Sequence, residues 1–182
     1  MKLLGLCGSL RQGSYNRRLL DAASAELPPE VRLEIFDGLA DLPPYNEDGP
    51  ASPAVRSLRA ALGGADGVLI ATPEYNASIP GHLKNALDWA SRPFPDNCLR
   101  AKPVAVVGAS TGLFGAVWAQ AELRKVLRTI GARVVDVELP VGQAHDAFTD
   151  DGRLVDPEVG SALGSIVGRL VDECRPLVEL SA

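Results

Sequence analysis

A short polar segment near the N-terminus, GSLRQGSYN at residues 8–16, carries the residue types that bind a phosphate. It follows the apolar run 3–7 and precedes a run with helical spacing. Backbone N–H groups at a helix start point outward, and the helix dipole favours an anion there. Arg11 adds a fixed positive charge, and Ser9, Ser14 and Asn16 add small polar donors. The segment therefore predicts a phosphate-binding loop.

Two common phosphate-binding motifs are absent from this segment. No lysine follows Gly13, so the P-loop pattern of NTPases is missing, and no G-x-G-x-x-G follows the first apolar run. An NTPase and a dinucleotide-type Rossmann enzyme are therefore not the first choice. A hydroxyl-rich turn that only caps a helix is the alternative, but capping does not require Arg11.

Composition restricts the possible classes of protein. The 182 residues suit one domain over 1–182, and 46% hydrophobic with 23% charged residues is ordinary for a globular chain. A net charge of −5 argues against nucleic acid as a main partner. No apolar run approaches the ~20 residues of a membrane span, and the N-terminus is too short for a signal peptide. Cys7, Cys98 and Cys174 show no metal-ligand spacing, so we expect reduced thiols in the cytoplasm.

Strand-like and helix-like segments alternate along the chain. The expected strands are residues 2–7, 31–36, 67–71, 103–108 and 133–139. The expected helices are residues 16–27, 53–62, 80–90, 114–130 and 157–177. This order predicts an α/β fold with an open, mostly parallel sheet covered by helices on both faces. Ligands of such sheets bind beyond the carboxyl ends of the strands, which selects the loops after the first, third and fourth strands.

The loop after the third strand, residues 72–81, is bracketed by two prolines and is therefore stiff. Tyr75 offers an aromatic surface, and Asn76 offers both a donor and an acceptor. The loop after the fourth strand, GASTGLFG at 108–115, is rich in glycine and small side chains, so its backbone can approach a ligand closely. Neither loop holds a nucleophile–base pair. A bound cofactor that carries the chemistry, such as FMN, fits all three loops.

Several motifs together carry a family resemblance. They are GSLR at 8–11 with Ser14 and Asn16, LP at 42–43, YNED at 45–48, PEYN at 73–76, PG at 80–81 and LKNALDW at 83–89. In combination they resemble the NADPH-dependent FMN reductase family, within it the bacterial quinone and chromate reductases, from the N-terminus to about Gly131. The resemblance implies a flavodoxin-like fold with strand order 2-1-3-4-5 and noncovalent FMN.

The resemblance also implies which residues bind the cofactor. The phosphate would be held by Ser9, Arg11, Ser14 and Asn16, with Tyr15 beside them. The isoalloxazine ring would be lined by Pro73, Glu74, Tyr75 and Asn76, largely through backbone groups, and its other side closed by Ser110, Thr111, Gly112 and Gly115. The chain departs from the family at Ala77, where an aromatic residue is often found, and at Ala101, where glycine is common.

Family members are homodimers or homotetramers with the flavin near a subunit interface, which would place Tyr45 and Asn46 close to a neighbour's cofactor. Packing within the proline-rich loop is the alternative for Tyr45. Because a carboxylate near a flavin opposes the anionic reduced form, we expect Glu74 to face a partner arginine or solvent.

Other conspicuous side chains are interpreted as structural. The histidines at 82 and 145 have no carboxylate motif around them, and Lys84 with Asp88 forms an i,i+4 pair on a helix surface. Trp89 and Trp118 are expected in the core or in an interface. Cys7 is expected to pack as a small apolar residue at the end of a strand.

The predicted function is that of an oxidoreductase that passes hydride from NADPH or NADH through FMN to quinones, flavins, chromate or similar small acceptors. No protein side chain is predicted to be catalytic, and no metal is expected. A flavodoxin-type electron carrier without its own nicotinamide reaction is the main alternative, and the net acidity suits it. An FMN-free module that binds a phosphoester is the third.

Overall fold

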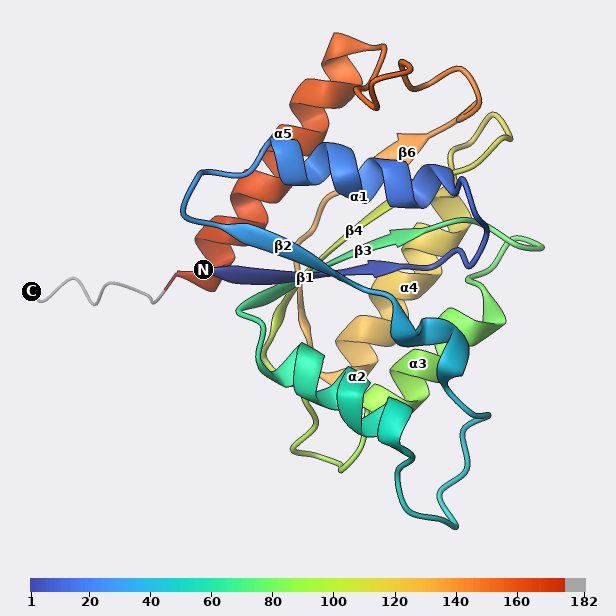
Figure 1. Cartoon of the computed structure of the whole chain (residues 1–182), viewed down its shortest axis with the longest axis vertical. Coiled ribbons are helices and arrows are strands. Elements are labelled where there is room, and N and C mark those ends of the chain that lie inside the picture. Colours follow the sequence, from blue (N-terminus) through green and yellow to red (C-terminus); the bar gives the residue numbers. More distant parts are fainter. Residues whose placement is uncertain (176–182) are drawn as a thin grey trace, which may run out of the picture.

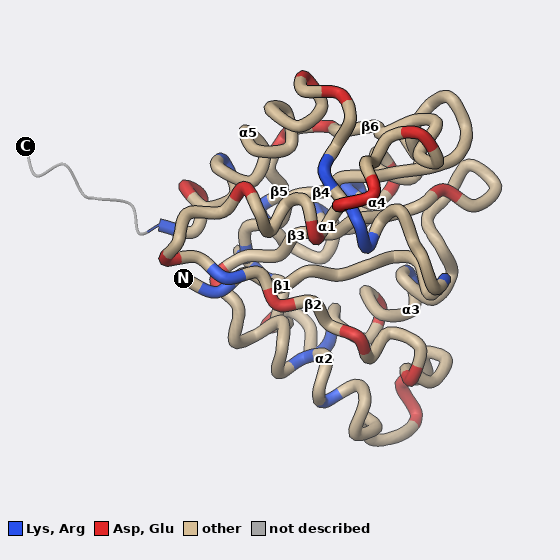
Figure 2. The backbone as a smooth tube through the Cα atoms, turned by 45° about the horizontal axis from the view of Figure 1, so that its top comes forward, with Lys and Arg blue, Asp and Glu red and all other residues tan. Residues whose placement is uncertain are grey.

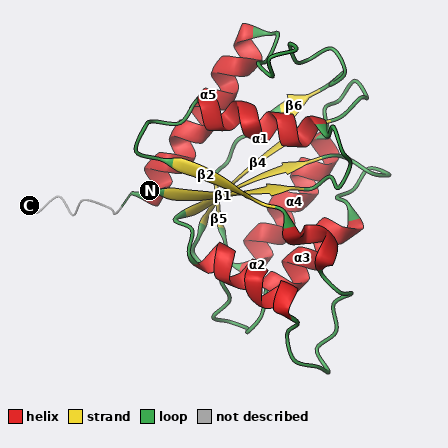
Figure 3. Ribbon diagram, viewed as in Figure 1, coloured by secondary structure: helices red, strands yellow, loops and turns green. Residues whose placement is uncertain are grey.

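A parallel sheet lies between two layers of helices in the computed structural model, which describes residues 1–175 (Figure 1, Figure 3). The strands are β1 (Lys2–Cys7), β2 (Arg32–Phe36), β3 (Gly67–Thr72), β4 (Pro103–Ala109), β5 (Arg133–Val134) and β6 (Pro140–Val141). The helices are α1 (Tyr15–Ala25), α2 (Pro53–Gly63), α3 (Gly81–Ala90), α4 (Val117–Ile130) and α5 (Pro157–Cys174), with a 3₁₀ helix at Gly38–Asp41.

The strand order is β2-β1-β3-β4-β5, with β6 also pairing to β4, and every pairing is parallel. This confirms the predicted flavodoxin-like order. Every residue of β3 and β4 is buried, as their uninterrupted apolar sequences indicate for strands covered on both faces. Because all strands run in the same direction, the loops after β1, β3 and β4 leave the same edge of the sheet (Figure 1).

The two helix layers create two separate apolar cores. Helices α1 and α5 cover one face, and α2, α3 and α4 cover the other (Figure 1). Alternation along β1 supplies both cores, since Leu3 faces the α1–α5 side while Leu4 and Leu6 face the opposite side. Basic and acidic positions are interspersed along the backbone (Figure 2). Among the described residues, no helix combines the length and apolar character that crossing a membrane requires.

The predicted continuous strand at 133–139 is wrong, because the edge of the sheet is divided into β5 and β6. A buried side chain from α4 lies between the two pieces. The amide of Gln120 donates to Leu139 O at 3.3 Å and accepts from Leu139 N at 3.2 Å. Arg124 donates to Val137 O at 3.3 Å. Gly108 N of β4 also donates to Leu139 O at 3.2 Å, so pairing with β4 resumes at this residue. The side chains from α4 thus bind the backbone of the segment between β5 and β6.

Three helix ends also differ from the prediction by more than one residue. Helix α1 ends at Ala25 rather than at residue 27. Helix α4 begins at Val117 rather than at residue 114, because Gly115 and Ala116 have φ of 57° and 62°, which a right-handed helix does not allow. Helix α5 ends at Cys174, and Arg175 is already extended. The predicted end at residue 177 lies outside the described residues.

Candidate functional site

The loop after β1 presents a row of unpaired backbone donors. Ser14 caps α1, since its Oγ accepts from the N–H of Arg17 at 3.4 Å. Among residues 1–175, no hydrogen-bond partner contacts the backbone N–H groups of residues 9, 10 and 12–16. Free backbone donors in a loop that leads into a helix start are suited to binding an anion. The geometry supports the predicted phosphate loop.

Arg11 supplies the charge of this loop. Its side chain is exposed, donates to Gly13 O at 3.4 Å and lies 5.7 Å from the centre of the Tyr15 ring. No carboxylate of the described residues forms an ion pair with it. The loop borders a hollow of about 250 Å³ that Ser9, Arg11 and Ser14 line together with Phe36 from β2. The guanidinium is therefore available to an incoming anion.

Two residues predicted near the phosphate have other contacts. The ring of Tyr15 stacks on Phe148, with centroids 6.3 Å apart and planes inclined by 10°. The buried amide of Asn16 donates to Ala109 O at 2.9 Å and accepts from Ala109 N at 3.0 Å. Asn16 thus fastens the start of α1 to the end of β4. Only its second amide proton is left for a ligand, and contact with the phosphate remains a prediction.

The loop after β3 makes a tight two-residue turn. Tyr75 and Ser78 exchange backbone hydrogen bonds of 3.0 and 3.1 Å across Asn76 and Ala77, whose φ values are 54° and 59°. Two consecutive positive φ values are typical of a type I′ turn. The N–H groups of residues 74, 76 and 77 have no partner within the described chain. Tyr75 is 47% exposed, so the turn offers both donors and aromatic surface.

Pro73 and Glu74 begin this loop. Pro73 is buried, and its carbonyl accepts from the Thr72 hydroxyl at 2.8 Å. The expectation that Glu74 faces a partner arginine or solvent is wrong. Its Oε2 accepts from the backbone N–H groups of Trp118 and Ala119, both at 3.1 Å. This carboxylate has a structural use that sequence reasoning did not identify.

The loop after β4 is held by the segment that follows β6. Ser110 N donates to Val141 O, and Gln143 N donates to Gly112 O, both at 3.0 Å. The N–H groups of Thr111 and Gly112 have no partner among the described residues, and both residues are exposed. They can meet a ligand as predicted.

Gly115, also predicted to close this side of the site, is buried against β6. A Cβ there would lie 2.4 Å from the carbonyl carbon of Pro140, so glycine is required for this close approach. The residue therefore shapes the loop by packing, and a direct ligand contact of Gly115 remains a prediction.

Three side chains link the three loops to one another. Asn16 joins the first loop to the end of β4, and Glu74 joins the loop after β3 to α4. His82 at the start of α3 completes the set, because its Nε2 lies 3.1 Å from Gly8 O. Burial lowers the pKa of His82 below its ordinary value, although the contact with Gly8 opposes that shift. The contact satisfies the ring nitrogen, and the structural role expected for this histidine remains a prediction.

The proline-rich loop packs on α3. Asn85 accepts from Tyr45 N at 2.7 Å and donates to Pro43 O at 2.9 Å, and Trp89 Nε1 donates to the same carbonyl at 2.8 Å. The ring of Tyr45 meets Trp89 edge to face, with centroids 5.0 Å apart. Thus Trp89 is in the core, as predicted, and Tyr45 packs within the chain. The sequence signal for this contact was the joint presence of the YNED motif at 45–48 and the LKNALDW motif at 83–89.

The remaining predicted roles have mixed outcomes. Lys84 and Asp88 form the expected ion pair at 2.7 Å. Trp118 is 50% exposed and thus outside the core of this chain. Cys7 is half-buried and more than an apolar filler, since its thiol donates to Ser9 O at 3.4 Å.

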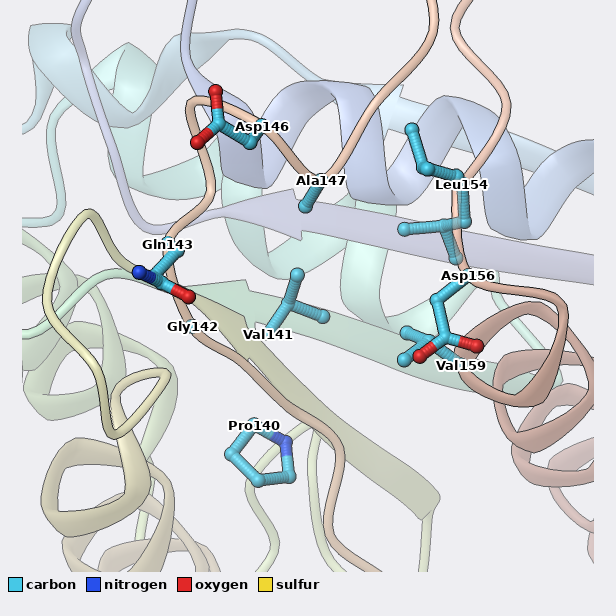
Figure 4. A pocket seen from close by; sticks show the side chains of 10 residues that line it. Pro140, Val141, Gly142, Gln143, Asp146, Ala147, Leu154, Asp156 and Val159 are labelled. Atoms are coloured by element: carbon cyan, nitrogen blue, oxygen red, sulfur yellow. The ribbon is translucent and has the colours of Figure 1, made fainter.

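A second hollow, of about 230 Å³, lies between β6, the segment 142–156 and the start of α5 (Figure 4). Its apolar lining includes Val141, Ala147, Leu154 and Val159. Asp146 and Asp156 also line the hollow, and in Figure 4 Asp156 lies beside Val159 while Asp146 lies on the Gln143 side. The lining contains two carboxylates and no lysine or arginine, so its charge disfavours a phosphate. Of the two hollows, the one beside the loop after β1 is the one whose lining contains arginine.

Comparisons with known proteins agree with this geometry. The model of the NADPH-dependent FMN reductase family matches residues 1–146. An NAD(P)H-dependent FMN reductase of Pseudomonas aeruginosa is 44% identical over 160 residues, covering 86% of this chain and 85% of the relative. A quinone reductase of Pseudomonas putida is 40% identical over 153 residues, covering 82% of each protein.

A solved structure shows the same arrangement. The flavoenzyme FerB of Paracoccus denitrificans, an NAD(P)H:(acceptor) oxidoreductase, superposes with a TM-score of 0.83 at 34% identity. The match covers 95% of this chain and 96% of that one, so the whole sheet and both helix layers are shared.

Proposed function

The chain belongs to the NADPH-dependent FMN reductase family, and from that premise we propose that it is an FMN-dependent oxidoreductase. Its net reaction takes NAD(P)H, a proton and a quinone to NAD(P)⁺ and a hydroquinone, so two electrons and two protons reach the acceptor. Free flavins and chromate belong to the same class of small acceptors. The names of the relatives from two Pseudomonas species support this assignment.

One observation carries the proposal: the loop after β1 contains seven backbone N–H groups without a hydrogen-bond partner and an arginine without a carboxylate partner among residues 1–175. This donor set fits the phosphate of FMN, with Ser9, Arg11 and Ser14 as its side-chain ligands. The backbone donors after β3 and β4 fit the polar edge of the ring. FMN would supply the two-electron chemistry that no side chain of the site provides.

In this proposal the residues of the chain position the cofactor and shield it from water. The turn at Asn76 and Ala77 holds its backbone donors on a stiff loop, and Tyr75 gives an apolar wall. Two titratable side chains that contact these loops, Glu74 and His82, are engaged by backbone groups. Burial raises the pKa of the Cys98 thiol, and that of Cys174 to about 11, so both thiols are neutral near pH 7. Rate enhancement then depends on orientation of the reactants.

A homo-oligomer is also proposed. Leu113, Phe114 and Trp118 are 71%, 60% and 50% exposed next to the loop after β4. The two aromatic rings contact each other edge to face, with centroids 5.2 Å apart. A continuous exposed apolar patch of this kind is typical of an interface. Light scattering should show a dimer or tetramer, and Trp118→Glu should shift it toward the monomer; a monomeric wild type would contradict the proposal.

We also propose that the protein is located in the cytoplasm. All three cysteines are free, and none pairs with another. Free thiols suit a reducing compartment.

The decisive experiment is a visible spectrum of the protein purified with FMN, followed by anaerobic addition of NADPH or NADH. We expect bound yellow flavin that bleaches rapidly after mixing in a stopped-flow instrument and recovers when a quinone is added. An electron carrier would bind FMN but bleach slowly. A protein that stays colourless after incubation with FMN would support the phosphoester-binding alternative.

A further inference from the structure

His82 contacts the backbone of the phosphate loop. Its Nε2 lies 3.1 Å from Gly8 O, although the two residues are 74 positions apart in the sequence. A carbonyl oxygen only accepts hydrogen bonds, so the proton of the neutral ring is on Nε2. The lowered pKa from burial is consistent with a neutral ring. The histidine is thus a directed donor to one carbonyl.

This donor fixes the peptide plane between Gly8 and Ser9. In a trans peptide the C=O and the following N–H point in opposite directions. With Gly8 O turned toward α3, the N–H of Ser9 is turned away from α3, and it has no partner among the described residues. Ser9 also lines the hollow beside Arg11. The orientation of the Gly8 carbonyl therefore directs the Ser9 N–H away from α3, where it is available to a ligand.

Close packing leaves Gly8 little freedom. Its own N–H donates to Ala71 O at 2.8 Å. A Cβ at this position would lie 3.0 Å from Leu83 Cδ2 and 3.2 Å from Ala71 O. The next carbonyl is held as well, because the thiol of Cys7 donates to Ser9 O at 3.4 Å, and Leu10 N has no partner within the described chain. Two consecutive N–H groups freed in this way resemble an anion-binding nest.

We propose that His82 is a positioning residue of the cofactor site, which holds the Gly8 carbonyl so that the Ser9 N–H binds the phosphate of FMN. This inference rests on the proposed function. It predicts that the contribution of His82 to affinity requires the phosphate group of the ligand. Riboflavin lacks that group and keeps the ring, so the pair of ligands separates this role from general packing.

The test compares FMN and riboflavin affinities of three variants by flavin fluorescence. His82→Leu fills the space without a donor and should raise the Kd for FMN about fivefold, the effect of one hydrogen bond, and leave the Kd for riboflavin within about twofold. His82→Gln keeps an N–H at the reach of Nε2 and should restore the FMN affinity to within about twofold. His145→Leu, at an exposed histidine outside the three loops, should change neither.

Other outcomes overturn the inference. They are an unchanged Kd for FMN in His82→Leu, equal losses for both ligands, or failure of the glutamine variant to restore binding. Thermal unfolding of each variant checks that it is folded. If the leucine variant does not fold, His82→Asn replaces it, since its shorter amide does not reach Gly8 O. A wild-type protein that binds no FMN would contradict the proposed function itself, which is a distinct result.

Discussion

The carboxylate of Glu74 and the backbone N–H of Trp118 form a hydrogen bond of 3.1 Å between segments 44 residues apart. Helix α4 has no cap of its own, because Ala116 stands at the N-cap position with φ of 62° and no side-chain acceptor. The first N–H groups of a helix need partners, and a negative charge there also interacts favourably with the dipole. From the loop after β3, Glu74 supplies both the hydrogen-bond acceptor and the negative charge.

Removal of this carboxylate should destabilise the protein. We expect Glu74→Ala to lower the free energy of unfolding by about 1 kcal/mol, the usual effect of losing a helix cap. Urea denaturation followed by circular dichroism measures the change. Glu30→Ala, at an exposed position, should remain within about 0.5 kcal/mol of the wild type. Equal stability of the two variants would show that the cap contributes nothing.

Arg11 should dominate the affinity for the cofactor. A charge-assisted hydrogen bond contributes about 1.5–3 kcal/mol, so Arg11→Ala should weaken FMN binding by about 10- to 100-fold. Equilibrium dialysis with FMN gives the Kd directly. Arg169→Ala removes an equal charge from the exposed surface of α5 and should leave the Kd unchanged. A similar loss in both variants would indicate only a general effect of net charge.

Ala77 stands at a position that favours glycine. Its φ of 59° is unfavourable for any residue with a Cβ, and the side chain is exposed. Ala77→Gly should therefore raise the free energy of unfolding by about 0.5–1 kcal/mol, after allowance for the greater freedom of glycine in the unfolded chain. Ala60→Gly, on the exposed surface of α2, should have the opposite sign and a similar size. If Ala77→Gly and Ala60→Gly both lowered the free energy of unfolding, the backbone at Ala77 would not be strained.

Stability should depend on pH through His82. Because burial lowers its pKa in the folded state, the unfolded chain takes up a proton first as pH falls below about 6.5. This contribution is fully present above that pH and decreases as pH falls toward the folded-state pKa. As pH falls from about 7 to about 5, the wild type should therefore lose stability relative to His82→Gln. Parallel pH profiles of the two proteins would refute this.

Local sequence patterns predicted the interior of the sheet correctly. The apolar runs that became β3 and β4 are buried from end to end. The alternation of strands and helices predicted a parallel sheet, while the order of the strands was implied by the family resemblance and is confirmed. The prediction of a continuous edge strand was wrong between β5 and β6, where side chains of Gln120 and Arg124 from the neighbouring helix bind the backbone of Leu139 and Val137. Periodicity describes which face a residue occupies, but it contains no information on a side chain that enters the ladder from another element.

The candidate site shows the same division. Residue types predicted a phosphate loop and its charge, because such a loop depends on nine consecutive positions. The partners of Asn16 and Glu74 were missed, since Ala109 and Trp118 are 93 and 44 residues away in the chain. Only the folded sheet brings those groups together.

The links made by Asn16, Glu74 and His82 close a triangle around the sheet edge. Loops linked by such hydrogen bonds are preorganised, so they lose little conformational entropy when a ligand binds. Loosening one brace frees the two loops that it joins, and the third loop loses the fixed neighbours against which it is aligned. Affinity for the cofactor is thus a collective property of this edge.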